Sequence, residues 1–475
     1  MSLSPTTDNI DVNSVASPDK ETNVFFVKSV NTLYTRLENE SLTPNALIRL
    51  EQAIPSLCLL SWLQSNNAHK HASYWSNRDK SFGISGIGCA IKLQTTKRSE
   101  LPKLFRQIKE IIQDRSVRFI GGIAFNERVS SNTWENFPFA QFILPEIEIV
   151  YRDNQYILAV NLFAKDLPQL KRQHQQRLKR LKELRFTSLN SSSNSGSALS
   201  DHKILERVNT PRRDQWKTNV NFALSKIKAG KLNKVVLSRD TKLTINAPLS
   251  APQLLKKWQE VNENGFLFCI QNGQSTFLGN SPERLYSREH AFINTEAIAG
   301  TVPRGVTPMT EKAGEQQLIN DPKLIREHKV VADYITLQLK DICDHISNMQ
   351  PLSILKLANI QHLKTPFKAR LKPSISDSNI ILKLHPTPAV CGSPLNESMS
   401  LIDQQEESPR GWYAGLVGTI SENEAEFCVA IRSILLKSNT IHCYSGVGLV
   451  EGSEEASEWD ELESKIQTVL SLFQA

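Results

Sequence analysis

The N-terminal third of the chain alternates short apolar runs with polar turns, which predicts β-strands joined by turns. A helical spacing of apolar positions occurs there at 101–113. Few helices separate the strand-like runs, so we predict mostly antiparallel pairing. A doubly wound parallel fold is disfavoured, because no Gly-x-Gly-x-x-Gly segment follows a strand. The predicted strands span 24–27, 57–62, 82–93, 117–125, 139–151 and 155–163.

After residue 205 the pattern mixes helices with strands and tight turns. Apolar residues recur at helical spacing in some segments and alternate with polar residues in others. The predicted elements are helices at 216–229, from 321 onward and from 458 onward, a strand at 234–239, a hairpin at Asn272-Gly273, and a meander of strands at 411–420, 426–436 and 440–449. This region is therefore predicted to combine antiparallel strands with covering helices.

These patterns divide the chain into four segments. They are a polar, disordered N-terminus at 1–22, a sheet-rich subdomain at 23–165, a basic helix with a Ser-rich linker at 166–204, and a region at 205–475 that holds the candidate chemistry. The basic helix allows a non-enzymatic alternative, a module that binds nucleic acid or another anionic surface. No aromatic residues interleave its charges as a stacking platform requires, and a solvated helix face is the other interpretation.

Composition narrows the classes of function only slightly. A chain of 475 residues, 40% hydrophobic and 22% charged, is ordinary for a globular protein with a large core. A net charge of +7 suits an anionic small substrate as well as nucleic acid or an acidic membrane surface. The seven cysteines never form Cys-x-x-Cys, which favours a reducing compartment over a disulfide framework. No signal or membrane-spanning segment is apparent, so we expect a cytoplasmic protein.

Two residues of the C-terminal region are candidates for proton transfer. Strand alternation places Lys234 on one face with Val236, where partial burial favours the neutral amine of a general base. Glu283 follows Pro282 near a hairpin end, so its carboxyl projects from a rigid corner. Raising the pKa of a glutamate to near 7 takes roughly 4 kcal/mol of burial or like-charge repulsion. The alternatives are a lysine that reaches water and a glutamate paired with Arg284 or another cation.

A carboxylate-rich face is predicted at the start of the last helix. Helical periodicity places Glu458, Glu461 and Lys465 on one side of that helix. Mg²⁺ binds a few stiffly held oxygen ligands of this kind. Glu327, in the early turns of the helix that starts at 321, is a further candidate ligand. The alternative is a solvated acidic first turn that favours the helix dipole.

Further features fit a small anionic ligand. Arg432 shares a face with Ala430 in the predicted middle strand of the meander, where it needs a substrate carboxylate or an internal acid as its partner. The small residues around Gly300 and Thr301 allow close approach of the backbone to a ligand. The proline-rich segment that carries His385 is predicted to form a cavity wall.

Nine short segments carry a resemblance to the chorismate-utilising enzymes, in which similar segments occur in the same order. They are Lys-Val-Val-Leu-Ser-Arg (234–239), Ser-Pro-Glu-Arg-Leu (281–285), Thr-Glu-Ala-Ile-Ala-Gly-Thr (295–301), Glu327-His328, His-Pro-Thr-Pro-Ala (385–389), Tyr413-Ala-Gly, Ile431-Arg432, Ser-Gly-Val-Gly (445–448), and Glu458-Trp459 with Glu461 and Lys465. The resemblance covers about 205–470, and isochorismate synthases are the most similar group. The N-terminal half shares only its strand-rich character.

The resemblance implies an α/β fold of the α+β type, a large single chorismate-binding domain of mostly antiparallel sheets flanked by helices. It also implies Mg²⁺ and chorismate in a central cleft. Lys234 is similar to the base that activates water for attack at C2 of the ring, and Glu283 to the acid that protonates the departing C4 hydroxyl. Glu327 and Glu461 are similar to the magnesium ligands of the family, and Glu458 is similar to a group beside them. The residues similar to those that contact the substrate are Gly300, Thr301, His385, Tyr413, Arg432, Gly446 and Lys465.

Relatives within the family define the alternatives. Anthranilate synthases carry glutamine at the position of Lys234, and aminodeoxychorismate synthases carry lysine at that of Ala299, so neither pattern matches. Salicylate synthases share Lys234 and Glu283 and go on to eliminate pyruvate, which leaves that activity open. Leu324 stands where several relatives have a further acidic residue. We expect a monomeric isochorismate synthase without nucleic-acid or membrane partners, and its product could feed quinone, siderophore or salicylate synthesis.

Overall fold

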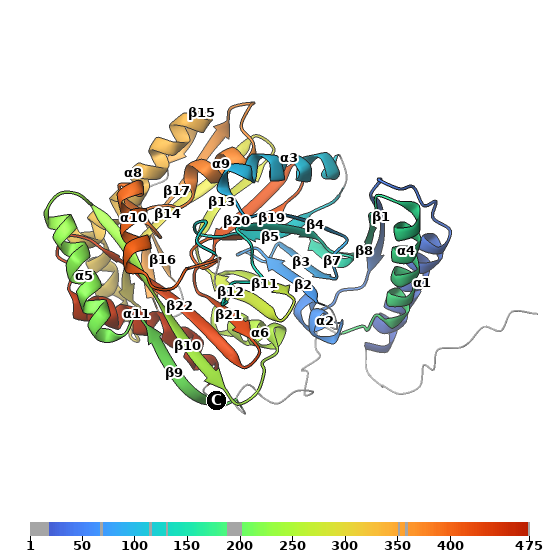
Figure 1. The fold of residues 1–475 in the computed structure, drawn as a ribbon, viewed down its shortest axis with the longest axis horizontal. Helices are drawn as coiled ribbons and strands as arrows, with labels where there is room; N and C mark the ends of the chain where they lie inside the picture. The colour runs from blue at the N-terminus through green and yellow to red at the C-terminus, as the bar shows by residue number, and fades with distance from the viewer. Residues whose placement is uncertain are drawn as a thin grey trace, which may run out of the picture.

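The computed structural model describes residues 19–66, 70–113, 116–129, 132–187, 202–349, 352–356 and 360–473. Within these residues the strands form a 12-stranded and a 10-stranded sheet, and every strand pair is antiparallel. Helices flank both sheets (Figure 1). The predicted α/β class with mostly antiparallel sheets is confirmed.

The 12-stranded sheet contains strands from both halves of the chain. Its order is β1 (Ile48–Ile54), β8 (Gln155–Leu162), β7 (Ile147–Arg152), β3 (Phe82–Ile87), β2 (His71–Ser76), β11 (Phe266–Asn272), β12 (Ser275–Ser281), β21 (Ser433–Lys437), β22 (Thr440–Leu449), β10 (Lys234–Ile245) and β18 (Gly392–Ser393), with β9 (Ile204–Thr210) paired to β10. The β2–β11 pair joins the N-terminal strands to the C-terminal ones.

The 10-stranded sheet is also shared between the two halves. Its order is β15 (Cys343–Met349), β17 (Ile360–Leu371), β14 (Phe292–Pro303), β13 (Arg284–Glu289), β20 (Glu424–Val429), β19 (Leu416–Ile420), β5 (Phe119–Ile123), β6 (Ala140–Leu144) and β4 (Ile91–Thr95), with β16 (Ser353–Lys356) paired to β17. The β5–β19 pair makes the second junction. The described strands between residues 23 and 165 therefore continue both sheets.

The helices lie over the sheets and at their ends. They are α1 (Asp19–Glu38), α2 (Leu59–Asn66), α3 (Leu101–Ile112), α4 (Leu167–Glu183), α5 (Arg213–Lys228), α6 (Ala251–Val261), α7 (Pro308–Asn320), α8 (Pro322–Ile342), α9 (Asp377–Leu384), α10 (Leu395–Gln405) and α11 (Glu455–Leu470). Helices α1 and α4 pack together beside β1 and β8 at one end of the molecule, and α8 and α11 lie at the other end (Figure 1). In the described part of the chain, no helix is long and apolar enough to cross a membrane.

The larger hydrophobic core joins the two sheets. It includes Phe268 and Phe277 from the 12-stranded sheet and Phe142 and Phe427 from the 10-stranded sheet, all fully buried. Trp412 meets Phe277 edge-on, with 6.2 Å between the ring centroids. A second core lies under α1, α2, α4 and α6. Burial of large aromatic side chains on facing sheets stabilises this arrangement.

Two predicted strands of the N-terminal region are helices instead. Residues 24–27 belong to α1, because Phe26, Leu33 and Leu37 recur at helical spacing and are buried, whereas the neighbouring Phe25 is exposed. Residues 59–62 of the predicted strand at 57–62 belong to α2. A run of a few apolar residues fits either element, and burial on one face decides between them. The predicted disordered segment 1–22 is wrong at its end, because residues 19–22 form the first turn of α1, and its residues 1–18 lie outside the described residues. The Ser-rich part of the predicted linker, at 188–201, also lies outside them.

The predicted middle strand of the meander is two strands in different sheets. Strand β20 ends at Val429 in the 10-stranded sheet, and β21 starts at Ser433 in the 12-stranded sheet. Arg432 lies in the crossover with a φ of 49°, a left-handed conformation that is unusual for a side chain of this size. The crossover, rather than strand alternation, sets the position of Arg432.

Candidate active site

One cavity collects residues from both sheets and from helices α8 and α11. Nine of the twelve predicted site residues line it: Lys234, Glu283, Thr301, Glu327, Tyr413, Arg432, Gly446, Glu461 and Lys465. The lining among the described residues does not include Gly300, Glu458 or His385, but it does include His362, which the sequence did not single out. Charged and polar residues that are far apart in the sequence therefore line the same cavity.

Lys234 is buried at the start of β10. Its side chain is 1% exposed, and Nζ lies 2.9 Å from Oε1 of Glu327 on α8. Gly448 on the neighbouring strand β22 faces this ion pair. A Cβ atom at Gly448 would lie 2.8 Å from Cε of Lys234 and 2.9 Å from Oε1 of Glu327. Glycine at 448 therefore leaves the room that the ion pair needs.

Glu283 lies in the turn between β12 and β13 and is buried. Its backbone N–H donates to Oγ of Ser281 (3.3 Å), and its carbonyl accepts from the N–H of Val429 (3.0 Å). Burial raises the pKa of Glu283 to about 8; the charge of Glu296 adds to this rise and Lys234 opposes it. A carboxyl with this pKa holds its proton at neutral pH, as a general acid requires.

Helix α8 presents Glu327 to the cavity. The Asp321 side chain caps its N-terminus by accepting from the N–H groups of Lys323 (2.8 Å) and Leu324 (3.4 Å). Pro322 begins the helix, where a missing N–H costs nothing. Glu327 lies in the second turn of this capped helix, so the cap fixes its position opposite β10.

Helix α11 contributes Glu461 and Lys465. Nζ of Lys465 lies 2.7 Å from Oε1 of Glu461 and donates to the Gly446 carbonyl at 2.8 Å. Buried Leu462 and Ile466 hold the helix against the core. Although burial raises it, the Lys465 ammonium lowers the pKa of the Glu461 carboxyl, so this carboxyl is ionised at neutral pH.

The predicted third carboxylate, Glu458, is buried beside the cavity rather than in its wall. Lys323 lies 3.0 Å from its Oε1. The pKa of Lys323 is raised: burial lowers it, but Glu458, Glu327 and Glu461 outweigh burial. Among the described residues, no group of three or more His, Cys, Asp or Glu side chains is arranged to hold a metal ion. Within the described ranges, the helices therefore contribute two acids to the cavity wall, Glu327 and Glu461, and both act on the charge of Lys323.

Arg432 places a guanidinium in the cavity. Among the described residues it donates one side-chain hydrogen bond, a long one of 3.4 Å to the carbonyl of Lys465. Burial lowers its pKa from the ordinary arginine value, but arginine remains charged at neutral pH. Its other N–H groups are available to an anion, and the ammonium of Lys465 lies on the same cavity wall.

Thr301 and His362 form a polar pair in the wall. Oγ1 of Thr301 lies 3.0 Å from Nδ1 of His362. Burial, together with the charges of Arg432 and Lys465, lowers the pKa of His362 to about 3, so the ring is neutral at physiological pH. Gly300 has a φ of 77° at an irregularity in the β14–β17 pairing, and this bulge sets the direction of Thr301. No sequence motif surrounds His362, which explains why it was missed.

His385 does not line the cavity as predicted. Its ring is 1% exposed and packs edge-on against Phe125, with centroids 6.4 Å apart. Burial lowers its pKa to about 3. The proline-rich segment does form part of the wall, but through Ala389 and Val390. An imidazole at the start of a stiff loop resembles a ligand contact in sequence, and the packing of the loop directs it into the core.

Comparisons with known proteins agree with this geometry. The family model described as "Chorismate binding enzyme" matches residues 32–474. The isochorismate synthase MenF of Haemophilus influenzae is 30% identical over 432 residues, which cover 90% of this chain and 92% of that protein. The chloroplastic isochorismate synthase 2 of Arabidopsis thaliana is 30% identical over 462 residues, 89% of this chain and 80% of that protein.

The fold also matches a solved relative. The structure of MenF, the menaquinone-specific isochorismate synthase from Escherichia coli, superimposes with a TM-score of 0.82 at 26% identity, covering 94% of this chain and 99% of that one. The match includes the N-terminal half, for which the sequence motifs gave no family signal. The chain therefore belongs to the chorismate-binding enzyme family, in its isochorismate synthase group.

Proposed function

We propose that this protein is an isochorismate synthase that converts chorismate to isochorismate. The observation that carries the proposal is that Lys234 and Glu283, both buried, line one cavity from different elements. Two buried titratable groups on a shared cavity are the usual arrangement for paired base and acid catalysis. The names of the relatives, all isochorismate synthases, support the same reaction.

In the proposed reaction a water molecule attacks C2 of the ring and the C4 hydroxyl departs. Lys234 takes a proton from the attacking water, and Glu283 gives a proton to the departing hydroxyl. The base gains one proton and the acid loses one, so the exchange of hydroxyl groups is balanced and reversible. A hydrogen bond of 2.9 Å from Nζ of Lys234 to Oε1 of Glu327 holds the amine in place, and the raised pKa of Glu283 keeps its proton available.

Cationic groups in the cavity suit the two carboxylates of chorismate. Arg432 has N–H groups available, and Lys465 lies on the same wall. A planar guanidinium matches a carboxylate with two parallel hydrogen bonds. We assign these two residues, together with the backbone near Gly446 and the hydroxyl of Tyr413, to substrate binding.

Glu327 and Glu461 fit a magnesium ion. Mg²⁺ is typically held by one or two carboxylates, with water and substrate oxygens completing its shell, and these two acids line the cavity from α8 and α11. When bound, the ion would supply positive charge to a substrate carboxylate. Glu458 is neutralised by Lys323, so we assign it to support of this site.

Two alternative functions are salicylate synthesis and the binding of nucleic acid or another anionic surface through the basic helix. Arg177 on α4 is 1% exposed and lies 2.7 Å from Glu146, so part of the helix charge is neutralised inside the protein. Neither this contact nor the cavity favours a nucleic-acid interface. Salicylate synthases share the acid and base, and product analysis separates them.

We expect incubation with chorismate and Mg²⁺ to give isochorismate without pyruvate. Chromatography separates isochorismate from salicylate, and pyruvate is measured with a coupled assay. Salicylate with an equal amount of pyruvate would assign the protein to salicylate synthesis. Chorismate left unchanged at all Mg²⁺ concentrations would contradict the enzymatic proposal.

Glu461→Gln should weaken Mg²⁺ binding by at least about tenfold, because it removes one of two carboxylate ligands. The measurement is the shift of the unfolding temperature during titration with MgCl₂, since an ion at 100 times its Kd stabilises the folded state by about 2.7 kcal/mol. Asp460→Asn removes the same charge from an exposed neighbour on α11 and serves as the matched control. An equal response to Mg²⁺ in both variants would contradict the assignment.

A further inference from the structure

The turn that carries Glu283 is held by an arginine from the other half of the chain. Arg78 follows strand β2, and its side chain is 15% exposed. Its Nη1 donates to the carbonyl oxygen of Pro282 at 2.9 Å. Pro282 directly precedes Glu283, so this bond fixes the peptide on the N-terminal side of the candidate acid.

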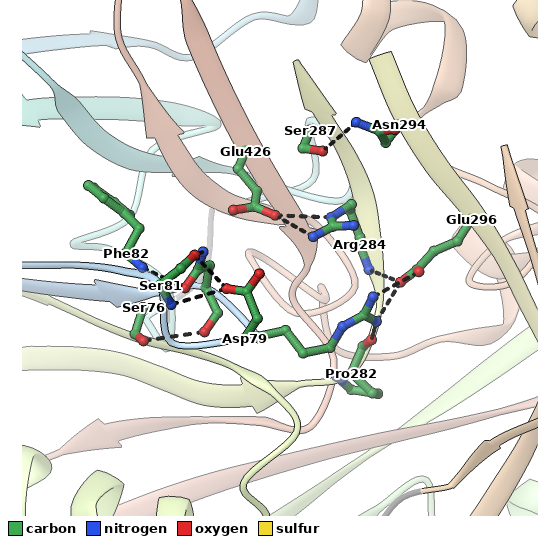
Figure 2. Close-up of polar contacts among 12 residues, drawn as sticks. Ser76, Asp79, Ser81, Phe82, Pro282, Arg284, Ser287, Asn294, Glu296 and Glu426 are labelled. Carbon is green, nitrogen blue, oxygen red and sulfur yellow. Dashed lines mark hydrogen bonds and ion pairs between the residues drawn. The ribbon is translucent and has the colours of Figure 1, made fainter. Parts of the chain in front are cut away.

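The same guanidinium also binds Glu296 on β14. Nη1 and Nη2 of Arg78 donate to Oε1 and Oε2 of Glu296 at 2.7 and 2.9 Å, a bidentate pair. Oε1 of Glu296 accepts from the N–H of Arg284 at 3.2 Å. Figure 2 shows the Glu296 carboxylate beside the backbone of Arg284, close to the Pro282 carbonyl. Arg78 and Glu296 therefore grip the residues immediately before and after Glu283, and we name this pair the Arg78–Glu296 clamp.

The clamp is buried and reinforced. The Glu296 side chain is 3% exposed, and Lys364 on β17 lies 2.9 Å from its Oε2. Although burial raises it, the hydrogen bonds and charge of Arg78 and the charge of Lys364 lower the pKa of Glu296 to about 2. Glu296 is thus a permanent anion at working pH. Neither Arg78 nor Glu296 is among the described residues that line the cavity, so neither contacts a substrate bound there.

We propose that the Arg78–Glu296 clamp positions Glu283 for proton transfer, which makes both members positioning residues of the active site. The inference rests on the proposed role of Glu283. Proton transfer depends on the placement of the donor, and a displacement of about 1 Å can lower the rate by about 100-fold. The clamp holds the Glu283 turn through two different peptide groups, which resists both translation and rotation of the turn.

A second consequence of the clamp is electrostatic. The charged groups that act on Glu283 are Lys234 on β10 and Glu296 on β14. The negative charge of Glu296 raises the pKa of Glu283, because a nearby anion disfavours a second one. The clamp therefore both places the carboxyl and helps it to keep its proton.

Two variants separate the effect of the position of Glu283 from the effect of the charge of Glu296. Arg78→Lys keeps the positive charge and loses the bidentate geometry, so kcat for isochorismate formation should fall about 100-fold, with KM changed by less than about twofold. Glu296→Gln keeps the volume and removes the negative charge, so the alkaline limb of the kcat–pH profile should move to lower pH. Thermal unfolding of each variant reports the folded fraction, to which kcat is normalised.

Arg118→Lys is the matched control, because Arg118 is another largely buried arginine of the N-terminal half, 11% exposed, and it pairs with a glutamate, Glu424, away from the Glu283 turn. It should change stability without changing normalised kcat or the pH profile. Normalised kcat that is unchanged in Arg78→Lys, or an alkaline limb that does not move in Glu296→Gln, would overturn the inference. Failure of the proposed function itself is distinct, because the unmodified protein would then form no isochorismate.

Discussion

Replacing Lys234 with alanine should lower kcat for isochorismate formation by about 1,000-fold. A positioned general base raises the reaction rate on the order of 10²- to 10⁴-fold. Lys234 is the candidate base, since its amine lines the cavity and lies 2.9 Å from Glu327. Substrate binding through Arg432 and Lys465 is retained, so KM should change little. Steady-state kinetics with quantified isochorismate checks both parameters.

Two further variants control for structural damage. Lys242→Ala removes an exposed lysine from the same strand, and we expect wild-type kinetics. Lys234→Gln keeps most of the side-chain volume and can still donate to Glu327, but it has no amine to accept a proton. If Lys234→Gln retained wild-type kcat, the base assignment would be wrong even though the fold was intact.

The fold was predictable to the extent that its signals are local. The Asn272-Gly273 turn predicts the β11–β12 hairpin, and Gly273 has the positive φ of 61° that such a turn needs. Residues 24–27 were wrongly assigned, because a short apolar run fits either element and Phe26 packs against the distant Phe186, with 5.4 Å between the ring centroids. The sharing of both sheets by the two halves also depends on long-range pairs, which alternation does not encode.

The candidate active site was likewise predictable only where its residues belong to local sequence motifs. Family motifs indicated the residues that reach the cavity from regular elements, such as Lys234 on β10 and Glu327 on α8. Arg432 was expected within a strand, whereas the chain changes sheets there. Arg78 and Glu296 are 218 positions apart, and no local pattern marks a hydrogen bond over that separation. The sequence therefore indicated the chemistry of the cavity, and the structure adds the groups that hold it in place.

Replacing Glu283 with glutamine should lower kcat by about 10²- to 10⁴-fold, since an amide cannot protonate the departing hydroxyl. In the unmodified protein, kcat should fall above about pH 8, because the pKa of Glu283 is raised to about 8 by burial and by the charge of Glu296. Residual activity of Glu283→Gln should lack this alkaline limb. If the limb persisted in the variant, another group would have to be the acid.

The same variant should be more stable than the unmodified protein at alkaline pH. The pKa of Glu283 is raised from 4.5 to about 8 in the folded state, so the folded state binds the proton more tightly than the unfolded state does. The stability that this group contributes is fully present below pH 4.5 and is lost as pH rises through about 8, a difference on the order of 5 kcal/mol. Glutamine does not titrate, so the variant should gain stability relative to the unmodified protein between pH 5 and 9 in denaturant unfolding at fixed ionic strength. A gain in stability together with a loss of activity identifies a buried acid that folding keeps protonated for catalysis, whereas a variant less stable at every pH would show that Glu283 serves the fold.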